Sequence, residues 1–274
     1  MQVIKLRNDV VIGDGRLVLL AGPCMAETLD VCLETGTFLK ELTSRLGIGY
    51  VFKASYDKAN RTSGSSRRGP GLEAGLAMLA EVKARLDVPV VTDVHESGEV
   101  ARVAEVADIL QIPAFLCRQT DLLMACGATG KPVNIKKGQF MAPEDMRGAV
   151  EKVRSAGSSP VMLTERGSSF GYHNLVVDFR SLPVMGGLDV PVVFDATHSV
   201  QLPGGLGNAS GGNREYVRPL ARAAAAVGID ALFTEVHPRP AEAWSDGANS
   251  LDFATAEQVI REVKAIHDLV KAGV

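Results

Sequence analysis

The chain has 274 residues, of which 46% are hydrophobic and 22% charged, and its net charge is −3. This is the composition of an ordinary globular protein with apolar material for one large core, and the near-neutral charge argues against nucleic acid or an anionic membrane as a partner. No apolar run reaches the roughly 18 residues of a spanning helix, and the first residues lack the apolar core of a signal peptide, so we expect a cytoplasmic protein with its four cysteines reduced.

Two short β-like runs open the chain, at 3–6 and 10–12, and the turn signal Gly13-Asp14-Gly15 follows them. They predict an N-terminal hairpin over about residues 2–15 that closes the bottom of a barrel. Eight further apolar runs are typical of strands buried on both faces. These runs cover residues 16–24, 50–55, 88–94, 108–112, 133–137, 161–164, 192–194 and 231–235.

Helical patterns alternate with these strands. They cover residues 29–46, 71–86, 97–107, 120–126, 143–156, a weaker stretch at 177–182, 214–227 and 254–272. Eight β–α alternations of roughly 30 residues predict an α/β fold in which residues 1–274 form one (β/α)8 TIM barrel. An open doubly wound sheet is the alternative, but no GxGxxG motif follows the first strand.

Polar side chains follow the predicted strands, at the face where a barrel carries its active site. Cys24, His198 and Glu235 each end a different strand, and Asp246 comes eleven residues after Glu235. A thiolate, an imidazole and two carboxylates suit a divalent transition metal. The alternative is a small buried cysteine, a structural histidine and solvated acids.

A second group of strand-end residues is cationic or amide-bearing. Its members are Lys53, Lys58, Asn60, Arg61, Lys136 and Arg166. Lys53 and Lys136 lie inside apolar strand patterns, where a buried cation needs a partner. Such a group at a barrel mouth suits phosphate or carboxylate ligands, although solvated surface cations are the alternative.

Three further features of the sequence each allow two interpretations. Asp93 and His95 in TDVHE, and Asp195 in DATH, suit either acid–base chemistry or support of neighbouring groups. The Gly-rich segment 201–212 is either a lid that excludes water or a surface insertion. His267 lies in the last predicted helix, where we expect it to be exposed.

Long motifs resemble those of the 3-deoxy-D-manno-octulosonate 8-phosphate synthases, also called 2-dehydro-3-deoxyphosphooctonate aldolases. The motifs include AGPC at 21–24, KASYDKANRTS at 53–63, QIPAFLCRQTDL at 111–122, PVNIKKGQF at 132–140 and FDATHS at 194–199, and they cover nearly the whole chain in order. The resemblance implies condensation of phosphoenolpyruvate, D-arabinose 5-phosphate and water, with release of inorganic phosphate, for lipopolysaccharide synthesis. It also implies a cytoplasmic barrel that forms a homotetramer.

The resemblance further implies roles for single residues. Cys24 is similar to the cysteine of the metal-dependent class, in which Zn, Fe, Mn or Co would be held by residues that match Cys24, His198, Glu235 and Asp246. The implied substrate-binding residues are Lys53, Lys58, Asn60, Arg61, Gln111, Ala114, Arg118 from a neighbouring subunit, Lys136 and Arg166. The candidate catalytic residues are Lys58, Asp93, His95, Cys24 and His198.

Two alternative functions remain at this stage. One is a 3-deoxy-D-arabino-heptulosonate 7-phosphate synthase, which uses erythrose 4-phosphate. Those enzymes typically have Pro-Arg after the lysine that matches Lys58, whereas this chain has Ala59-Asn60-Arg61. The other alternative is a catalytically silent barrel that binds a sugar phosphate.

Overall fold

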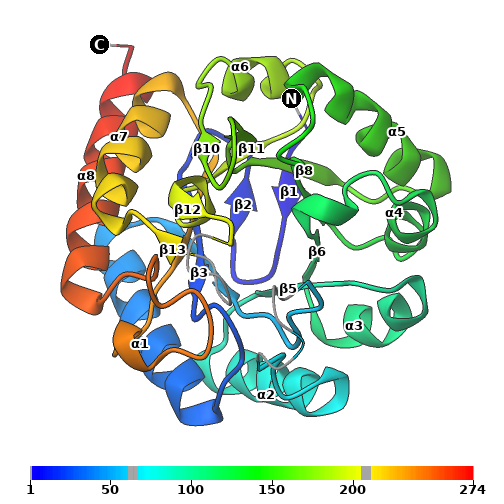
Figure 1. The fold of residues 1–274 in the computed structure, drawn as a ribbon, viewed down its shortest axis with the longest axis horizontal. Coiled ribbons are helices and arrows are strands. Elements are labelled where there is room, and N and C mark those ends of the chain that lie inside the picture. Colours follow the sequence, from blue (N-terminus) through cyan, green and yellow to red (C-terminus); the bar gives the residue numbers. More distant parts are fainter. Residues whose placement is uncertain (1, 61–63, 65–66, 205–210, 274) are drawn as a thin grey trace.

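The computed structural model describes residues 2–60, 64, 67–204 and 211–273. Eight parallel strands close into a barrel in the order β11-β14-β3-β4-β5-β6-β7-β8, with β8 paired to β11, and helices surround it (Figure 1). The strands are β3 (Val18–Gly22), β4 (Gly49–Lys53), β5 (Val90–Asp93), β6 (Ile109–Ile112), β7 (Val133–Lys136), β8 (Val161–Glu165), β11 (Val192–Asp195) and β14 (Ala231–Glu235). The predicted (β/α)8 barrel is confirmed.

The helices follow their strands as the periodicity predicts. They are α1 (Leu29–Leu46), α2 (Leu72–Leu86), α3 (Val100–Val106), α4 (Thr120–Gly127), α5 (Met146–Ala156), α6 (Ser181–Gly186), α7 (Val217–Val227) and α8 (Phe253–Lys271). The Thr28 side chain accepts from the backbone N–H of Val31 at the start of α1, and Gly47 ends that helix in the left-handed conformation that glycine adopts without strain. None of the helices in the described part of the chain is long and apolar enough to cross a membrane.

Two predictions about helices were wrong. The helical stretch at 177–182 was placed too early, because β10 (Leu175–Val176) pairs with β9 (Ser168–Ser169) and α6 starts only after this ladder. His267 is buried rather than exposed. It lies four residues after Val263, so it shares the buried face of α8.

The N-terminal hairpin closes the amino end of the barrel, as predicted. β1 (Ile4–Lys5) pairs antiparallel with β2 (Val11–Ile12), and both lie at the centre of the ring of helices (Figure 1). Ile4 and Ile12 pack with barrel-interior residues such as Val51 and Met162 in one buried cluster. The hairpin therefore covers one end of the barrel and leaves the other end for the site.

Short elements cover the carboxyl face. The two-stranded ladder of β12 (Gln201–Leu202) with β13 (Gly211–Gly212) lies within the segment that was predicted as a loop. The remaining short elements are the 3-10 turns η1 (Ser97–Glu99), η2 (Ala114–Leu116), η3 (Pro143–Asp145), η4 (His198–Val200), η5 (Arg214–Tyr216) and η6 (Pro240–Glu242). Half of the proposed lid, residues 205–210, lies outside the described residues.

Candidate active site

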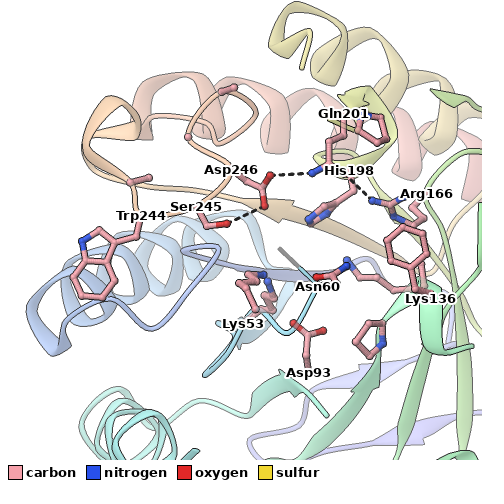
Figure 2. A pocket seen from close by; sticks show the side chains of 18 of the residues that line it. Lys53, Asn60, Asp93, Lys136, Arg166, His198, Gln201, Trp244, Ser245 and Asp246 are labelled. Carbon is pink, nitrogen blue, oxygen red and sulfur yellow. Dashed lines mark hydrogen bonds between the residues drawn. The ribbon is translucent and has the colours of Figure 1, made fainter. Parts of the chain in front are cut away.

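A cavity of about 820 Å³ opens at the carboxyl ends of the barrel strands. The structure brings ten of the predicted site residues to its wall: Lys53, Lys58, Asn60, Asp93, His95, Ala114, Lys136, Arg166, His198 and Asp246. Figure 2 shows that several of them point toward a shared space from different strands. Residues that are far apart in the sequence thus form one polar site, as expected of a closed parallel barrel.

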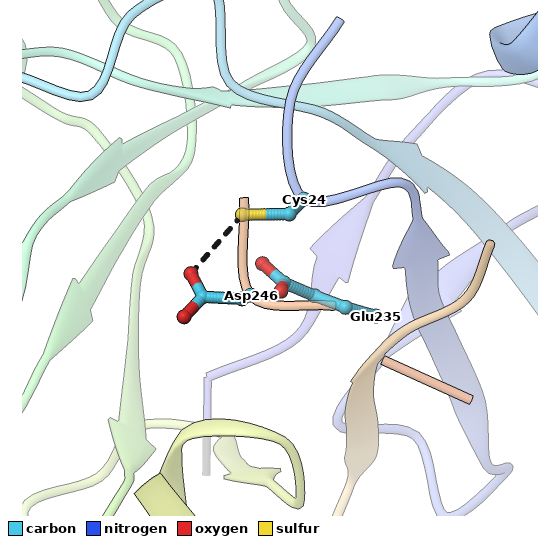
Figure 3. A group of neighbouring side chains, drawn as sticks. All are labelled: Cys24, Glu235 and Asp246. Atoms are coloured by element: carbon cyan, nitrogen blue, oxygen red, sulfur yellow. Dashed lines mark hydrogen bonds between the residues drawn. The ribbon is translucent and has the colours of Figure 1, made fainter. Parts of the chain in front are cut away.

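Three of the four predicted metal ligands form a compact group (Figure 3). Cys24 follows β3, Glu235 ends β14, and Asp246 lies in the loop after β14. One ligand atom from each lies within 4.8 Å of the others, and Cys24 Sγ donates to Asp246 Oδ2 at 3.2 Å. Glu235 Oε2 is buried without a hydrogen-bond partner among the described residues. A soft sulfur and two carboxylates fit a divalent transition metal.

His198 lies beside this group rather than within it. Its Nδ1 lies 2.8 Å from Asp195 Oδ2, and its Nε2 lies 3.6 Å from Glu235 Oε1. Asp195 also accepts from the backbone N–H of His198 at 2.9 Å, so the carboxylate fixes both the ring and the chain. A histidine held through Nδ1 presents Nε2 to a ligand.

Two buried lysines have the partners that their burial requires. Lys53 Nζ lies 3.0 Å from Glu235 Oε1 and donates to the Cys24 carbonyl at 3.1 Å. Lys136 Nζ donates to Asp195 Oδ2 at 2.6 Å and lies 3.7 Å from the centre of the Phe233 ring. Burial lowers the pKa of Lys136, and Asp195 opposes this shift. Both cations are therefore structural parts of the cavity wall and not solvated surface groups.

Asp93 anchors a buried chain of polar side chains. It accepts from Ser55 Oγ and, at 2.6 Å, from Gln111 Nε2, and Gln111 Oε1 accepts in turn from Asn134 at 2.9 Å. Burial alone would raise the pKa of Asp93, but Lys53 and Lys58 outweigh it and hold that pKa well below its usual range. Asp93 is thus an ionised acceptor that orients its neighbours, which favours the support interpretation over proton donation.

The rings of His95 and Tyr56 pack in a T-shaped pair, and His95 Nδ1 is buried without a partner among the described residues. Lys58 Nζ donates to Ser55 Oγ at 3.0 Å. Burial alone would lower the pKa of Lys58, but Cys24 and Glu235 raise it well above its usual value. The protonated form of Lys58 is therefore favoured.

Arg166 directly follows β8, and its guanidinium group lies at the cavity wall. Its Nη2 donates to Gln201 Oε1 at 3.1 Å, while its Nη1 is buried without a partner in the described part of the chain. Gln201 in turn donates to Asp246 Oδ1 at 2.9 Å (Figure 2). Burial alone would raise the pKa of Asp246, but His198 and Lys58 lower it to about 2. Gln201 was not predicted as a single residue, because an amide in a Gly-rich segment has no periodic or motif signal.

Not every predicted residue reaches the cavity. Arg118 is exposed and is absent from the described cavity wall of its own chain. Asn60 lies on the wall, but Arg61 lies outside the described residues. Gln139, which was not predicted, lines the cavity with a buried Oε1 that has no partner among the described residues.

Comparison with known proteins gives a consistent result over nearly the full length. Residues 1–272 match the model of the DAHP synthetase I family. The chain is 57% identical over 267 residues to a 2-dehydro-3-deoxyphosphooctonate aldolase of Cyanothece sp., covering 97% of this chain and 98% of the relative. It is 58% identical over 270 residues to the protein of that name from Syntrophotalea carbinolica, covering 98% of each chain. The corresponding Fusobacterium nucleatum protein is 56% identical over 268 residues, covering 98% of this chain and 96% of its own.

Proposed function

The chain belongs to the DAHP synthetase I family, and we propose that it condenses phosphoenolpyruvate with D-arabinose 5-phosphate and water. The products are 3-deoxy-D-manno-octulosonate 8-phosphate, a precursor of lipopolysaccharide, and inorganic phosphate. The relatives named 2-dehydro-3-deoxyphosphooctonate aldolase support this choice. The observation that carries it is a single cavity whose wall combines three lysine or arginine cations from strand ends, Lys53, Lys136 and Arg166, with Asp246 of the candidate metal group.

The reaction needs charge compensation and no covalent intermediate. C3 of phosphoenolpyruvate attacks the aldehyde carbon of the open-chain sugar, water adds at C2, and phosphate leaves when its C–O bond breaks. Two phosphorylated substrates repel each other, and fixed cations in a cavity offset this repulsion. Lys53 is ion-paired and Lys58 is held protonated, so neither is a ready nucleophile for a Schiff base.

We assign the two phosphates to different parts of the cavity. Lys136 and Arg166 would bind the phosphate of phosphoenolpyruvate, since Arg166 Nη1 has no partner among the described residues, and Ala114 lies on the same cavity wall. Gln111, predicted as a substrate-binding residue, is absent from the described cavity wall and instead hydrogen-bonds Asp93 and Asn134. Lys53 and Lys58 would face the carboxylate of phosphoenolpyruvate. The loop that carries Asn60 and Arg61 would bind the phosphate of the sugar, because it follows β4 at the mouth of the cavity.

A divalent ion, Zn, Fe, Mn or Co, would be held by Cys24, Glu235 and Asp246, with His198 Nε2 as the adjacent fourth ligand. Glu235 Oε2, which has no hydrogen-bond partner in the described part of the chain, and the mixed sulfur–oxygen set support this assignment. The ion would supply Lewis acidity to an oxygen of the bound substrate. Asp195 holds the His198 ring and Lys53 neutralises Glu235, so the chain's own residues orient the ligands.

We also propose a homotetramer in which Arg118 of the partner subunit completes the sugar-phosphate site. Large exposed aromatic side chains support a subunit contact near this face. Phe115, Phe140, Phe170 and Tyr172 follow the neighbouring strands β6, β7 and β8, and each is at least half exposed. Exposed large apolar side chains on loops that follow neighbouring strands are typical of a surface that another chain covers.

The proposed function is tested by phosphate release from phosphoenolpyruvate with arabinose 5-phosphate or erythrose 4-phosphate as the second substrate. We expect a much higher kcat/KM for the five-carbon sugar, because a four-carbon chain held by its phosphate leaves its aldehyde about one bond short, and a displacement of about 1 Å can cost roughly 100-fold. Arg61→Ala should reduce this preference. Preference for erythrose 4-phosphate would favour the heptulosonate alternative, and no release with either sugar would favour a silent binding barrel.

A further inference from the structure

Gln201 begins β12, and its side chain lies between the two functional parts of the cavity (Figure 2). Its Oε1 accepts from Arg166 Nη2 at 3.1 Å, and its Nε2 donates to Asp246 Oδ1 at 2.9 Å. The partners fix the orientation of the amide, because a guanidinium only donates and a carboxylate only accepts. One neutral side chain thus contacts the residue assigned to phosphate and a residue assigned to the metal.

The two contacts leave the other half of each charged group available. Arg166 Nη1 is buried without a partner among the described residues, and a buried donor of this kind is costly unless an acceptor arrives. Asp246 Oδ2 lies 3.2 Å from Cys24 Sγ, inside the candidate metal group, and also accepts from Ser245 Oγ at 3.2 Å. Gln201 therefore hydrogen-bonds Arg166 Nη2 and Asp246 Oδ1, the atoms that the phosphate and the metal do not need.

A neutral amide suits this position better than direct contact would. If Arg166 and Asp246 met, their opposite charges would pair in a largely buried place, and that pair would have to break before either residue bound its own ligand. Gln201 makes one hydrogen bond with Arg166 and one with Asp246, and it neutralises neither charge. The separation keeps a cation available for phosphate and an anion available for metal.

We infer that Gln201 is a positioning residue that couples the phosphate site to the metal site, an inference that rests on the proposed function. The Gln201 side chain is held by two hydrogen bonds, one from each neighbour. Loss of Arg166 leaves Oε1 without its donor, so only one hydrogen bond still holds the side chain beside Asp246. Binding at each end thus depends on the other end through Gln201, and such coupling is reciprocal.

The first test is Gln201→Leu, which keeps much of the side-chain bulk and removes both hydrogen bonds. Two affinities are measured on the folded protein: Co²⁺ affinity by competition with a chelator, and phosphoenolpyruvate affinity of the metal-free protein by calorimetry. We expect each affinity to fall roughly tenfold, as is typical when a residue that orients a ligand group is lost. Gln258→Leu on the exposed face of α8 is the matched control and should change neither.

The second test is a double-mutant cycle for Co²⁺ affinity with Gln201→Leu and Arg166→Met. Removing the Arg166 charge alters metal affinity through space in both backgrounds, so this effect cancels in the cycle. Only communication through Gln201 remains. The quantity compared is the ratio of Co²⁺ affinities between the Arg166→Met protein and its parent. We expect this ratio to be about fivefold lower in the Gln201 background than in the Gln201→Leu background, which is at the lower end of usual coupling free energies.

The outcomes distinguish failure of the proposed function from failure of the coupling role of Gln201. A wild-type protein that binds no phosphoenolpyruvate would contradict the proposed function, and the Co²⁺ measurements would still decide the role of Gln201. A Gln201→Leu protein whose Co²⁺ affinity stays within about twofold of wild type, or a cycle that is additive, would overturn the coupling role. Circular dichroism and urea unfolding confirm that each variant is folded.

Discussion

Lys53 Nζ lies 3.0 Å from Glu235 Oε1, and neither side chain is more than 1% exposed. Lys53 ends β4 and Glu235 ends β14, the two strands on either side of β3 in the barrel. Lys53 also donates to the Cys24 carbonyl, just beyond β3. This ion pair therefore joins three strand ends at the candidate metal group and neutralises one of its carboxylates.

We expect Lys53→Met to destabilise the metal-free protein by about 3 kcal/mol, because removing one member of a buried ion pair leaves an uncompensated charge. The measurement is urea unfolding in the presence of a chelator. Lys264→Met is the control, since Lys264 pairs with Asp268 on the exposed side of α8. That exposed pair should contribute less than about 1 kcal/mol. A Lys53→Met protein as stable as wild type would show that the pair has no structural role.

We expect activity to fall when a chelator removes divalent metal and to return when Co²⁺ is added. The Co²⁺ form should show thiolate-to-cobalt charge-transfer absorption, and Cys24→Ser should lose it. Cys126→Ser is the matched control, because Cys126 is buried in α4 and is not part of the candidate metal group. Full activity of chelator-treated, metal-free protein would contradict the metal assignment.

We expect Arg166→Ala to weaken phosphoenolpyruvate much more than arabinose 5-phosphate. The substitution removes a charge-assisted contact, which contributes roughly 1.5–3 kcal/mol when both partners are charged. Steady-state KM values for the two substrates are the measurement, and Arg180→Ala, an exposed arginine beyond β10, is the control. Equal losses for both substrates would show that Arg166 has been assigned to the wrong phosphate.

The barrel was predictable because its strands are buried on both faces. In β3 every residue is buried, with Leu19 in the outer cluster beneath the helices and Leu20 in the barrel interior. Such strands give continuous apolar runs that end where the backbone reaches the carboxyl face. The convergence of Cys24 and Glu235 followed from that rule alone, because parallel strand ends of a closed barrel meet at one edge.

What remained unpredictable depends on contacts between loops. Gln201 acts through Arg166 and Asp246, which lie 35 and 45 residues away, and no local pattern specifies that meeting. The α6 boundary was missed because residues 177–180 form an irregular segment and a turn after β10, in which Asp178 accepts from the backbone N–H of Arg180. His267 was predicted to be exposed because histidine is polar, although its position in α8 places it on the buried face.

We expect Gly22→Ala to destabilise the protein by about 3 kcal/mol. Gly22 ends β3 beside β4, and an added methyl group would overlap the Lys53 carbonyl oxygen, which is backbone and cannot move aside. Overpacking of this kind typically costs about 1–3 kcal/mol, and backbone contact places it at the upper end. Gly98→Ala in η1 is the control, since nothing lies within 4 Å of its added methyl group. Equal unfolding midpoints for the two variants would contradict the close approach of β3 and β4.

The last prediction concerns His267, whose two ring nitrogens are buried without hydrogen-bond partners among the described residues. Burial lowers its pKa below the usual 6.5, with Lys271 acting in the same direction and Asp268 opposing it. Lys264 on α8 and Asp230 before β14 are the other charged groups nearby. Below pH 6.5 the unfolded chain binds a proton at this residue that the folded protein does not bind. The contribution of neutral His267 to stability is therefore complete above about pH 6.5 and is lost as the pH falls toward the lower folded-state pKa.

We expect His267→Phe to remove this part of the pH dependence and to leave stability near neutral pH equal or higher, because two unsatisfied polar atoms disappear. The measurement is the free energy of unfolding between pH 7.5 and about pH 5, compared as a difference between variant and wild type so that the other titrating groups cancel. The difference should grow in favour of the variant as the pH falls. His267→Gln, which is polar but does not titrate, should show the same slope with lower stability throughout. Parallel curves for wild type and both variants would show that His267 takes up its proton equally well in the folded and unfolded chain.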